Sequence, residues 1–470
     1  MARTRLMCTL GPASATPKMV RGLAKAGASI FRVNLSHGTP DEHARSVRIV
    51  REAERETGRI LAVLADLPGP KVRLRQVEPD PLRIRSGQSF RLRPGGPGDV
   101  HGAATTYADL ASDLLPGDRV LLADGAVELT VTGVEGADLV TECVRGGTLR
   151  SRQGVNVPAE RLRLPAVTDR DREGLARMLA LEIDLVAQSF VRDAEDVALL
   201  RSLMGSRPVP IVAKIETRPA VDAIEGILEV TDAVMVARGD LGVELPMEEI
   251  PLLQKDLMRA ARGAGRPVVV ATQMLESMIR APRPTRAEAT DVANAVLDGA
   301  DAIMLSGETA IGEYPFEAAS AATNIATAAE SRGAEYRAAQ PPCTHQGEAE
   351  AVAHAAAGIA HGEIGLTAIA CYTETGRTAA LLSVERPQVP IVAFVPDPAI
   401  RRANALLWGV TALPAAVPHD TDAMIALMDA GLREAGLAVV GDTVVMAAST
   451  PAGRTHTNML KVHRIGDPVR

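Results

Sequence analysis

The sequence predicts an α/β fold: a (β/α)8 barrel with a small inserted β-barrel lid domain and a C-terminal α/β domain. Eight short apolar runs recur along the chain, each followed by polar or Gly-rich residues and then by a helical pattern. Such runs are typical of parallel strands that are buried on both faces. A chain of 470 residues is also long enough for about three domains. An open doubly wound sheet has the same periodicity and is the alternative fold.

The apolar runs place the predicted barrel strands at residues 5–9, 29–34, 60–66, 184–189, 210–216, 232–237, 267–272 and 301–306. After the third run the sequence pattern changes to short segments of alternating apolar and polar residues, separated by Gly-containing turns. This pattern predicts an inserted β-rich lid. We therefore expect the barrel at 1–69 and 166–340 and the lid at 70–165. The C-terminal domain is expected at 346–470, with strands at 367–372, 390–395 and 443–448. The polar, Pro-bearing stretch 331–350 is predicted to be a linker.

Composition excludes several classes of protein. The net charge of −7 argues against a nucleic-acid binder or a protein that docks on acidic membranes. Only 2% of the residues are aromatic, so the core must be aliphatic and no platform for base stacking is available. The four cysteines are far apart, as in a reduced cytoplasmic protein. No stretch resembles a signal peptide or a membrane helix.

Polar side chains gather where the predicted barrel strands end, which is where barrel enzymes place their chemistry. By strand, these residues are Arg32, Asn34 and Ser36; Asp66, Lys71 and Arg73; Lys214 and Glu216; Asp240; Thr272; and Ser306 and Glu308. Taken singly, each of them is most simply a helix cap or a salt-bridge partner.

Taken together, these residues predict a binding site for a metal cation next to a binding site for an anionic phosphoryl group. Glu216 and Asp240 at adjacent strand ends provide the one or two carboxylates that Mg²⁺ usually takes from a protein. Arg32, Arg73 and Lys214 would neutralise a phosphoryl group in transfer. The motifs of P-loop and protein-kinase enzymes are absent from the sequence.

Several segments together resemble the pyruvate kinase family over residues 5–462. They are TLGPAS, RVNLSHG, PIVAKIE, VMVARGDLG, ATQMLESM and the long run at 271–310. Family members have a barrel, a lid inserted after the third strand and a C-terminal regulatory domain, and they transfer the phosphoryl group of phosphoenolpyruvate to ADP. The resemblance implies phosphoenolpyruvate and ADP or ATP as partners, Mg²⁺ (or Mn²⁺) as cofactor, the last step of glycolysis as function, and a homotetramer.

The resemblance also implies roles for single residues. Glu216 and Asp240 match the divalent-metal ligands of the family. Lys214 matches the lysine that stabilises charge on the transferring phosphoryl group, and Arg32 matches the arginine that grips the substrate phosphate. The backbone amides of Gly239 and Asp240 would hold the substrate carboxylate.

The remaining matches concern the proton and the nucleotide. Thr272 lies beside the carbon to be protonated, and Ser306 and Glu308 are candidates for a water relay to it. The sequence does not identify the proton donor. The nucleotide-binding matches are Arg73, Asn34, His37 and Pro12, and Asp124 on the lid could complete the closed site.

The monovalent-cation site departs from the common pattern. Many members bind K⁺ through residues that match Asn34, Ser36 and Asp66, with Glu where this chain has Lys71 and Thr or Ser where it has Leu67. The Lys/Leu combination resembles the K⁺-independent branch, in which a lysine ammonium supplies the missing charge. We therefore expect that K⁺ is not required.

The C-terminal domain carries YTETGRTAALL after a strand. It resembles the sugar-phosphate effector loop of the family, with the cradle residues Thr373, Thr375, Gly376, Arg377 and Thr378. Glu374 stands where members activated by fructose 1,6-bisphosphate often have Lys, so we expect a monophosphate effector or little activation. A structural turn without ligand is the simpler reading of the same residues.

Two other functions share parts of this pattern. One is a metal-dependent (β/α)8 lyase or aldolase that acts through an enolate and needs no lid or C-terminal domain. The other is a non-catalytic, effector-sensing homologue, which would be expected to have lost Lys214 or a metal ligand, whereas both carboxylates and the lysine are present.

Overall fold

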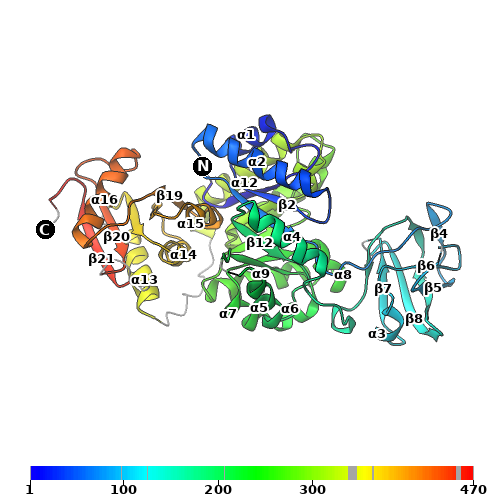
Figure 1. The fold of residues 1–470 in the computed structure, drawn as a ribbon. Coiled ribbons are helices and arrows are strands. Elements are labelled where there is room, and N and C mark those ends of the chain that lie inside the picture. Colours follow the sequence, from blue (N-terminus) through cyan, green and yellow to red (C-terminus); the bar gives the residue numbers. More distant parts are fainter. Residues whose placement is uncertain are drawn as a thin grey trace.

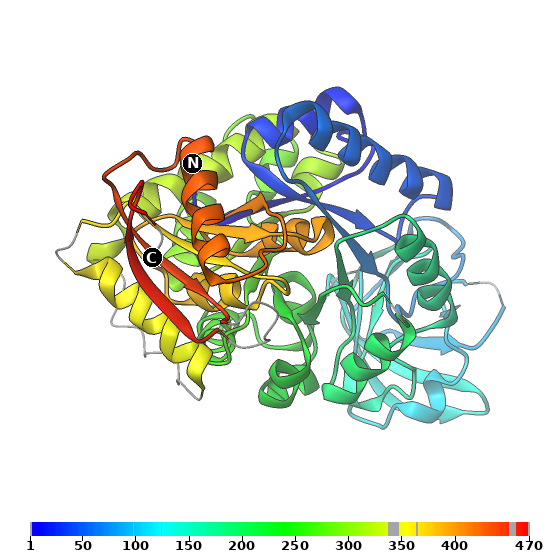
Figure 2. The ribbon, with the colours of Figure 1, turned by 60° about the vertical axis from the view of Figure 1, so that its left-hand side comes forward.

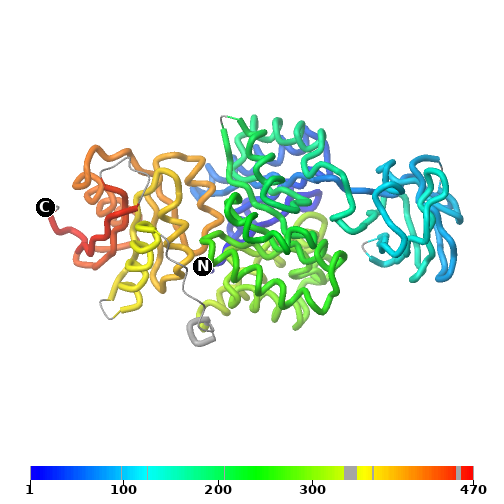
Figure 3. The backbone as a smooth tube through the Cα atoms, turned by 90° about the horizontal axis from the view of Figure 1, so that it is seen from below, coloured from blue at the N-terminus to red at the C-terminus, as the bar shows by residue number. Residues whose placement is uncertain are grey.

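The computed structural model describes residues 2–96, 98–123, 125–205, 207–336, 347–362, 365–450 and 457–468. Three parts lie in a row, with the barrel in the middle, a β-rich unit at one end and an α/β unit at the other (Figure 1). The same order is seen from below in Figure 3. The β-rich unit and the α/β unit therefore lie on opposite sides of the barrel.

The central part is a closed parallel barrel, as the sequence predicts, with strand order β1-β16-β15-β14-β13-β12-β3-β2. The strands are β1 (Arg5–Thr9), β2 (Ala28–Asn34), β3 (Ala62–Leu67), β12 (Leu185–Gln188), β13 (Ile211–Ile215), β14 (Ala233–Ala237), β15 (Val268–Ala271) and β16 (Ala302–Leu305). Closure of the barrel excludes the open doubly wound sheet. Side chains such as Met7, Ile30, Leu64 and Met235 fill its interior, so the core is aliphatic.

Helices surround the barrel, and their starts follow ordinary capping chemistry. Thr39, Thr168 and Thr285 each close a capping box with an acidic residue three positions later. The helices are α1 (Pro17–Lys25), α2 (Pro40–Thr57), α4 (Asp169–Ala180), α5 (Ala194–Leu203), α6 (Arg218–Asp222), α7 (Ile224–Val230), α8 (Arg238–Glu244), α9 (Ile250–Gly263), η2 (Glu276–Ile279), α10 (Arg286–Asp298), α11 (Gly307–Ala310) and α12 (Pro315–Tyr336). No helix in the described part of the chain is long and apolar enough to cross a membrane.

The chain leaves the barrel after β3, builds the lid and returns before β12 (Figure 2). The lid elements are β4 (Leu82–Ile84), β5 (Ser89–Arg93), β6 (Gly102–Ala104), α3 (Leu110–Asp113), β7 (Arg119–Leu122), β8 (Val127–Glu135), β9 (Asp138–Arg145), β10 (Gly147–Leu149), β11 (Val155–Asn156) and η1 (Ala159–Arg161). They form a six-stranded sheet, order β11-β7-β8-β9-β5-β6, and a β10-β4 pair. All neighbours are antiparallel except β5 and β6. The lid has its own apolar core around Phe90.

The C-terminal domain is a five-stranded sheet of order β19-β18-β17-β20-β21. Its elements are α13 (Glu348–His361), β17 (Ala368–Tyr372), α14 (Arg377–Val384), β18 (Ile391–Val395), α15 (Pro398–Ala403), η3 (Asn404–Leu406), β19 (Val410–Pro414), α16 (Thr421–Glu434), β20 (Thr443–Ala448) and β21 (Met459–Arg464). The sequence predicts its three central strands and misses the two edge strands, β19 and β21.

The predicted linker at 331–350 needs correction. Helix α12 continues to Tyr336 and α13 begins at Glu348, so both ends of this stretch are helical. Ala and Glu have high helix propensity, and this outweighs the polar character of the segment. Residues 337–346 lie outside the described residues, and so does Cys343. The cysteines Cys8, Cys143 and Cys371 are free and buried.

The barrel floor and the C-terminal domain meet through a buried ionic contact. Arg386 makes an ion pair of 2.8 Å with Asp301, the residue before β16, and both side chains are less than a tenth exposed. The same guanidinium stacks on the ring of Trp408, with its carbon 4.7 Å from the ring centroid. Arg3, from the barrel, covers Trp408 as well, at 5.2 Å. Trp408 therefore lies at the joint between the two domains.

Candidate active site

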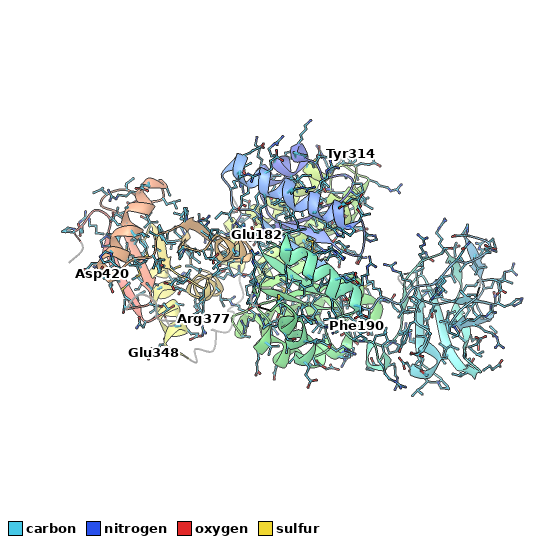
Figure 4. All side chains as sticks on the ribbon, viewed as in Figure 1. Glu182, Phe190, Tyr314, Glu348, Arg377 and Asp420 are labelled. Atoms are coloured by element: carbon cyan, nitrogen blue, oxygen red, sulfur yellow. The ribbon has the colours of Figure 1, made fainter. Side chains whose placement is uncertain are left out.

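The carboxyl ends of the barrel strands enclose a cavity of about 70 Å³ on the side of the lid. Phe190, just after β12, marks this end of the barrel (Figure 4). Of the residues predicted from the strand ends, the cavity is lined by Arg32, Asn34, Ser36, Asp66, Lys71, Lys214, Asp240, Thr272 and Ser306. The structure thus brings together side chains that are up to 274 positions apart, from Arg32 to Ser306.

Lys214 is a buried cation in the wall of this cavity. Its ammonium donates a hydrogen bond of 2.7 Å to the hydroxyl of Ser189 and lies 3.0 Å from Oε2 of Glu216. Asp66 is a third neighbour, at 3.8 Å. Burial alone would lower the pKa of Lys214, but the carboxylates of Asp66 and Glu216 outweigh burial and raise that pKa. Lys214 is therefore charged at every physiological pH.

Arg32 provides the second positive charge. Its Nε donates to Oδ2 of Asp66 at 2.6 Å, and its Nη1 donates to the hydroxyl of Thr9 at 3.1 Å. Burial raises the pKa of Asp66, but Lys214 and Arg32 outweigh burial and hold that pKa below its usual range. Asp66 is thus an ionised carboxylate between two cations and keeps both of them in fixed positions.

Glu216 and Asp240 have the character expected of ligands for a hard cation. Oε1 of Glu216 accepts a hydrogen bond of 2.8 Å from the amide of Phe190, whereas Oε2 is buried and has no hydrogen bond. Lys214 is within ion-pair distance of Oε2 but does not meet hydrogen-bond geometry. Burial raises the pKa of Glu216, Lys214 opposes the rise, and the nearby charge of Asp240 adds to it. A divalent cation would relieve this repulsion and satisfy the orphaned oxygen, so the residues fit such an ion.

The donor set is small. Within the described ranges, no group of three or more His, Cys, Asp or Glu side chains is arranged to hold a metal ion. Two carboxylates leave most of an octahedral shell to substrate oxygens and water, which is the usual situation for Mg²⁺.

The region predicted to replace a K⁺ site contains Lys71, whose ammonium lies 3.7 Å from Oδ1 of Asp240. Asn34 accepts a hydrogen bond of 3.0 Å from the amide of Ser36 through its side chain. Both residues line the cavity with Lys71, whereas the side chain of Leu67 is buried in the layer between strands and helices. The cavity is therefore lined by the side chain of Lys71, and the side chain at position 67 contributes no oxygen to it.

Thr272 contacts the start of α8 directly. Its hydroxyl accepts a hydrogen bond of 2.7 Å from the amide of Gly239 and donates one of 2.6 Å to the carbonyl of Ala271. The amide of Gly239 is predicted from the sequence to bind a substrate carboxylate, but in the structure it donates to the hydroxyl of Thr272. A substrate that uses it must compete with the threonine hydroxyl.

Ser306 and Glu308 have different positions. Glu308 is buried behind the cavity, where its carboxylate accepts hydrogen bonds from the amides of Leu275 (3.0 Å) and Ser306 (2.7 Å). It therefore ties together the chain segments that follow β15 and β16. Ser306 lines the cavity, and its buried hydroxyl has no hydrogen-bond partner. Of the two residues, only Ser306 offers a polar atom to the cavity.

The other predicted nucleotide residues lie outside this small cavity. Arg73 is where the chain enters the lid, and it donates a hydrogen bond of 3.1 Å to the carbonyl of Arg152. Pro12 is exposed in the turn after β1. Burial and the positive charges of Arg73 and Lys71 lower the pKa of His37, which is therefore neutral at pH 7. Asp124 lies outside the described residues.

Ser189 and Arg238 also lie at this end of the barrel, but they are not among the site residues predicted from the sequence. Ser189 ends the predicted fourth strand, so the strand-end rule could have found it. Arg238 directly follows β14, so the same rule could have selected it, but the rule does not show that its side chain bonds the neighbouring loop rather than lining the cavity.

The predicted effector loop forms the start of α14 and faces the barrel (Figure 4). The amide of Gly376, at φ +83°, donates to the hydroxyl of Thr373 at 3.0 Å, and Thr378 bonds the hydroxyl of Thr457 at 2.6 Å. Thr375, Gly376 and Arg377 line a cavity of about 1240 Å³ between barrel and C-terminal domain. Arg377 is already paired with Glu350 at 2.9 Å.

Comparisons with known proteins agree over the whole chain. Residues 1–319 match the family described as pyruvate kinase, barrel domain, and residues 350–463 match pyruvate kinase, alpha/beta domain. A pyruvate kinase of Mycobacterium tuberculosis (strain ATCC 25618 / H37Rv) is 43% identical over 471 residues, which cover 99% of each chain. One of Corynebacterium glutamicum is 41% identical over 475 residues, covering 100% of this chain and 98% of that relative.

The fold agrees with a solved structure as well. The crystal structure of a pyruvate kinase from Cryptosporidium parvum superposes with a TM-score of 0.90 at 32% identity, over 99% of this chain and 96% of that one. Matches of this length leave out neither the barrel, the lid nor the C-terminal domain. With the buried lysine and the carboxylate pair at the barrel mouth, they establish that the chain belongs to the pyruvate kinase family of phosphotransferases.

Proposed function

We propose that the cavity at the barrel mouth is where the phosphoryl group of phosphoenolpyruvate is transferred to ADP, giving pyruvate and ATP. The observation that carries this assignment is the buried ammonium of Lys214 beside the carboxylates of Glu216 and Asp66. A permanent positive charge in a buried position stabilises an anionic transition state far more than a surface charge does.

Lys214 and Arg32 act on the phosphoryl group in this proposal. Both lie in the cavity wall, and Asp66 holds them so that neither has to reorganise during transfer. Their charges offset the negative charge on the equatorial oxygens of the phosphoryl group. Arg73, Asn34, His37 and Pro12 are proposed to contact the nucleotide, and Arg73 reaches it from the lid entrance.

Glu216 and Asp240 are proposed to hold Mg²⁺ or Mn²⁺. The ion, when bound, supplies positive charge to the oxygens of both substrates. The orphaned oxygen of Glu216 and the mutual repulsion of the two carboxylates support this assignment. Lys71 is proposed to take the place of K⁺ beside Asp240.

The second half of the reaction places a proton on carbon. We propose that Gly239 and Asp240 orient the substrate carboxylate, and that Thr272 and Ser306 face the methylene carbon. The unpaired hydroxyl of Ser306 is suited to holding a water molecule for this proton. Glu308 accepts a hydrogen bond from the backbone amide of Ser306 and is proposed to orient Ser306 in this way, without contacting the water molecule itself.

Assembly, regulation and location belong to the same proposal. A homotetramer is proposed from the resemblance to the family alone. The loop Thr373–Thr378 is proposed to take a phosphomonoester, with Glu374 disfavouring a bisphosphate. The buried free thiols of Cys8 and Cys371 support a cytoplasmic location.

The test is pyruvate formation from phosphoenolpyruvate and ADP, measured through lactate dehydrogenase, with ATP quantified in the same reaction. Equal amounts of pyruvate and ATP are expected with Mg²⁺ present. A lyase or aldolase would form no ATP, and a non-catalytic homologue would form neither product. Either result would overturn the proposal.

A further inference from the structure

We propose that Arg238, oriented by Asp291, is a positioning residue that holds the loop after β15 in its active conformation. This inference rests on the proposed function, because it concerns the loop that carries Thr272 to the substrate. Neither side chain lines the cavity, so neither is expected to contact phosphoenolpyruvate or ADP.

The loop after β15 has an unfavourable backbone conformation. Thr272 has φ +68° and Gln273 has φ +55°, so two consecutive residues with side chains are in the left-handed region. A β-branched residue in that region is an outlier. Such a conformation persists only where surrounding contacts determine it, and it is concentrated at functional sites.

The guanidinium of Arg238 supplies such contacts. It donates a hydrogen bond of 2.8 Å to the carbonyl of Thr272 and approaches the carbonyl of Gln273 at 3.4 Å and the sulfur of Met274 at 2.8 Å. These are three successive residues of the strained loop. Because a guanidinium is planar and rigid, it fixes the directions of both carbonyls and hence the orientation of the peptide planes.

Two helices hold the guanidinium from behind. Asp291 on α10 makes an ion pair of 2.7 Å with Nη1 of Arg238, and Gln254 on α9 lies 3.4 Å from the same nitrogen. The Arg238 side chain is only 11% exposed, whereas that of Asp291 is 35% exposed. Asp291 thus orients Arg238 from a partly exposed position, so that substituting Asp291 leaves no cavity in the core.

The position of Arg238 in the chain connects this contact to the reaction. Arg238 begins α8, directly before Gly239 and Asp240, and the amide of Gly239 donates to the hydroxyl of Thr272. The start of α8 and the loop after β15 are therefore joined twice, by a side chain and by a backbone amide. Losing the side-chain contact would let Thr272 move against Asp240, and a displacement of about 1 Å can cost about 100-fold in rate.

The test compares Arg238→Met, Asp291→Asn and the double variant by steady-state kinetics. Arg238→Met is expected to lower kcat about 10- to 100-fold, with the KM for phosphoenolpyruvate changed less than about threefold. Asp291→Asn is expected to lower kcat in the same direction but less. The double variant should be no slower than Arg238→Met, because both residues act through one contact.

Arg51→Met is the matched control. Arg51 also bonds two carbonyls, of Leu61 and Glu182, and one carboxylate, of Asp184, but at the opposite end of the barrel. It is expected to lower the melting temperature and to leave kcat per folded molecule unchanged. If Arg51→Met lowers kcat as much as Arg238→Met does, the loss in Arg238→Met results from general destabilisation, and the inference is overturned.

The remaining outcomes are also decisive. Wild-type kcat in Arg238→Met, or multiplicative losses in the double variant, would contradict a shared positioning role. If Arg238→Met fails to fold, Asp291→Asn decides, and wild-type kcat there overturns the inference. Thr272→Ala distinguishes failure of this inference from failure of the proposed function. If Thr272→Ala is inactive and Arg238→Met is fully active, only the positioning role of Arg238 is rejected. If the wild type shows no turnover, the proposed function itself is rejected.

Discussion

The ammonium of Lys71 lies 3.7 Å from a carboxylate oxygen of Asp240, across the mouth of the barrel. Lys71 comes from the segment that leads into the lid, and Asp240 comes from the start of α8. Lys71 thus places a positive charge beside Asp240, where we propose that it takes the place of a monovalent cation.

Activity of the wild type should be independent of K⁺. Turnover in tetramethylammonium buffer is expected within about twofold of turnover in K⁺ buffer, because the lysine charge is already present. Lys71→Glu should lose about 100-fold in kcat without K⁺, as expected when one stabilising group is removed, and regain part of it when K⁺ is added. Lys255→Ala, which removes a lysine paired with Asp298 on the outside of the barrel, is the control. A strict K⁺ requirement of the wild type would reject this assignment.

Lys214→Met should abolish phosphoryl transfer and leave metal binding in place. The variant removes the buried charge but neither proposed metal ligand, so kcat should fall by about 1000-fold or more while Mn²⁺ still binds. Turnover is measured by the coupled assay, and Mn²⁺ binding by electron paramagnetic resonance. Retained turnover would exclude Lys214 from the transfer step, and lost Mn²⁺ binding would indicate a disturbed site.

Glu244 should make the fold less stable as the pH rises. Burial and the nearby charge of Glu160 raise the pKa of Glu244 to about 7 from a usual value of 4.5. Because the folded state then binds the proton more tightly than the unfolded state, this contribution to stability is complete below pH 4.5 and is lost as the pH rises through about 7.

Glu244→Gln is therefore expected to raise the melting temperature at pH 8 and to have no effect at pH 4.5. Thermal unfolding followed by circular dichroism measures both. The exposed Glu248, in the turn that follows α8, provides the matched control Glu248→Gln. An equal effect of Glu244→Gln at both pH values would show that Glu244 does not titrate in this range.

Glu374→Lys should improve the response to fructose 1,6-bisphosphate. Glu374 is exposed within the Thr373–Thr378 loop, where a carboxylate would repel a second phosphate and an ammonium would attract it. The concentration for half-maximal activation should fall by about tenfold, the equivalent of about 1.4 kcal/mol. Glu434→Lys, an exposed change at the end of α16, is the matched control. Strong activation of the wild type by the bisphosphate would contradict the preference for a monophosphate.

The barrel was predictable because its strands are buried on both faces and read as continuous apolar runs. The edge strands of the C-terminal domain were not, since β19 ends in Pro414 and has exposed positions, and β21 has only one buried side chain, that of His463. Likewise, the polar residues at the end of α12 were predicted to be a linker, but they continue the helix to Tyr336, because Ala and Glu have high helix propensity. Patterns of hydrophobicity thus identify central elements better than edges.

The site was predictable as a set of residues, but its contacts were not. The strand-end rule identifies Lys214, Glu216 and Asp240 without any coordinates. It does not predict that Thr272 takes the amide of Gly239, because this requires a left-handed backbone that a β-branched residue rarely adopts. Nor does it predict that the Arg238 side chain bonds the backbone carbonyls of that loop and does not line the cavity.

Trp408 gives this protein a built-in optical probe. It is the chain's one tryptophan, and guanidinium groups cover it from Arg3 and from Arg386. Its fluorescence emission therefore comes from the joint of barrel and C-terminal domain and from nowhere else. Ligands that shift one domain against the other can be titrated by emission wavelength without a label, and the nucleotide site contributes no indole signal of its own.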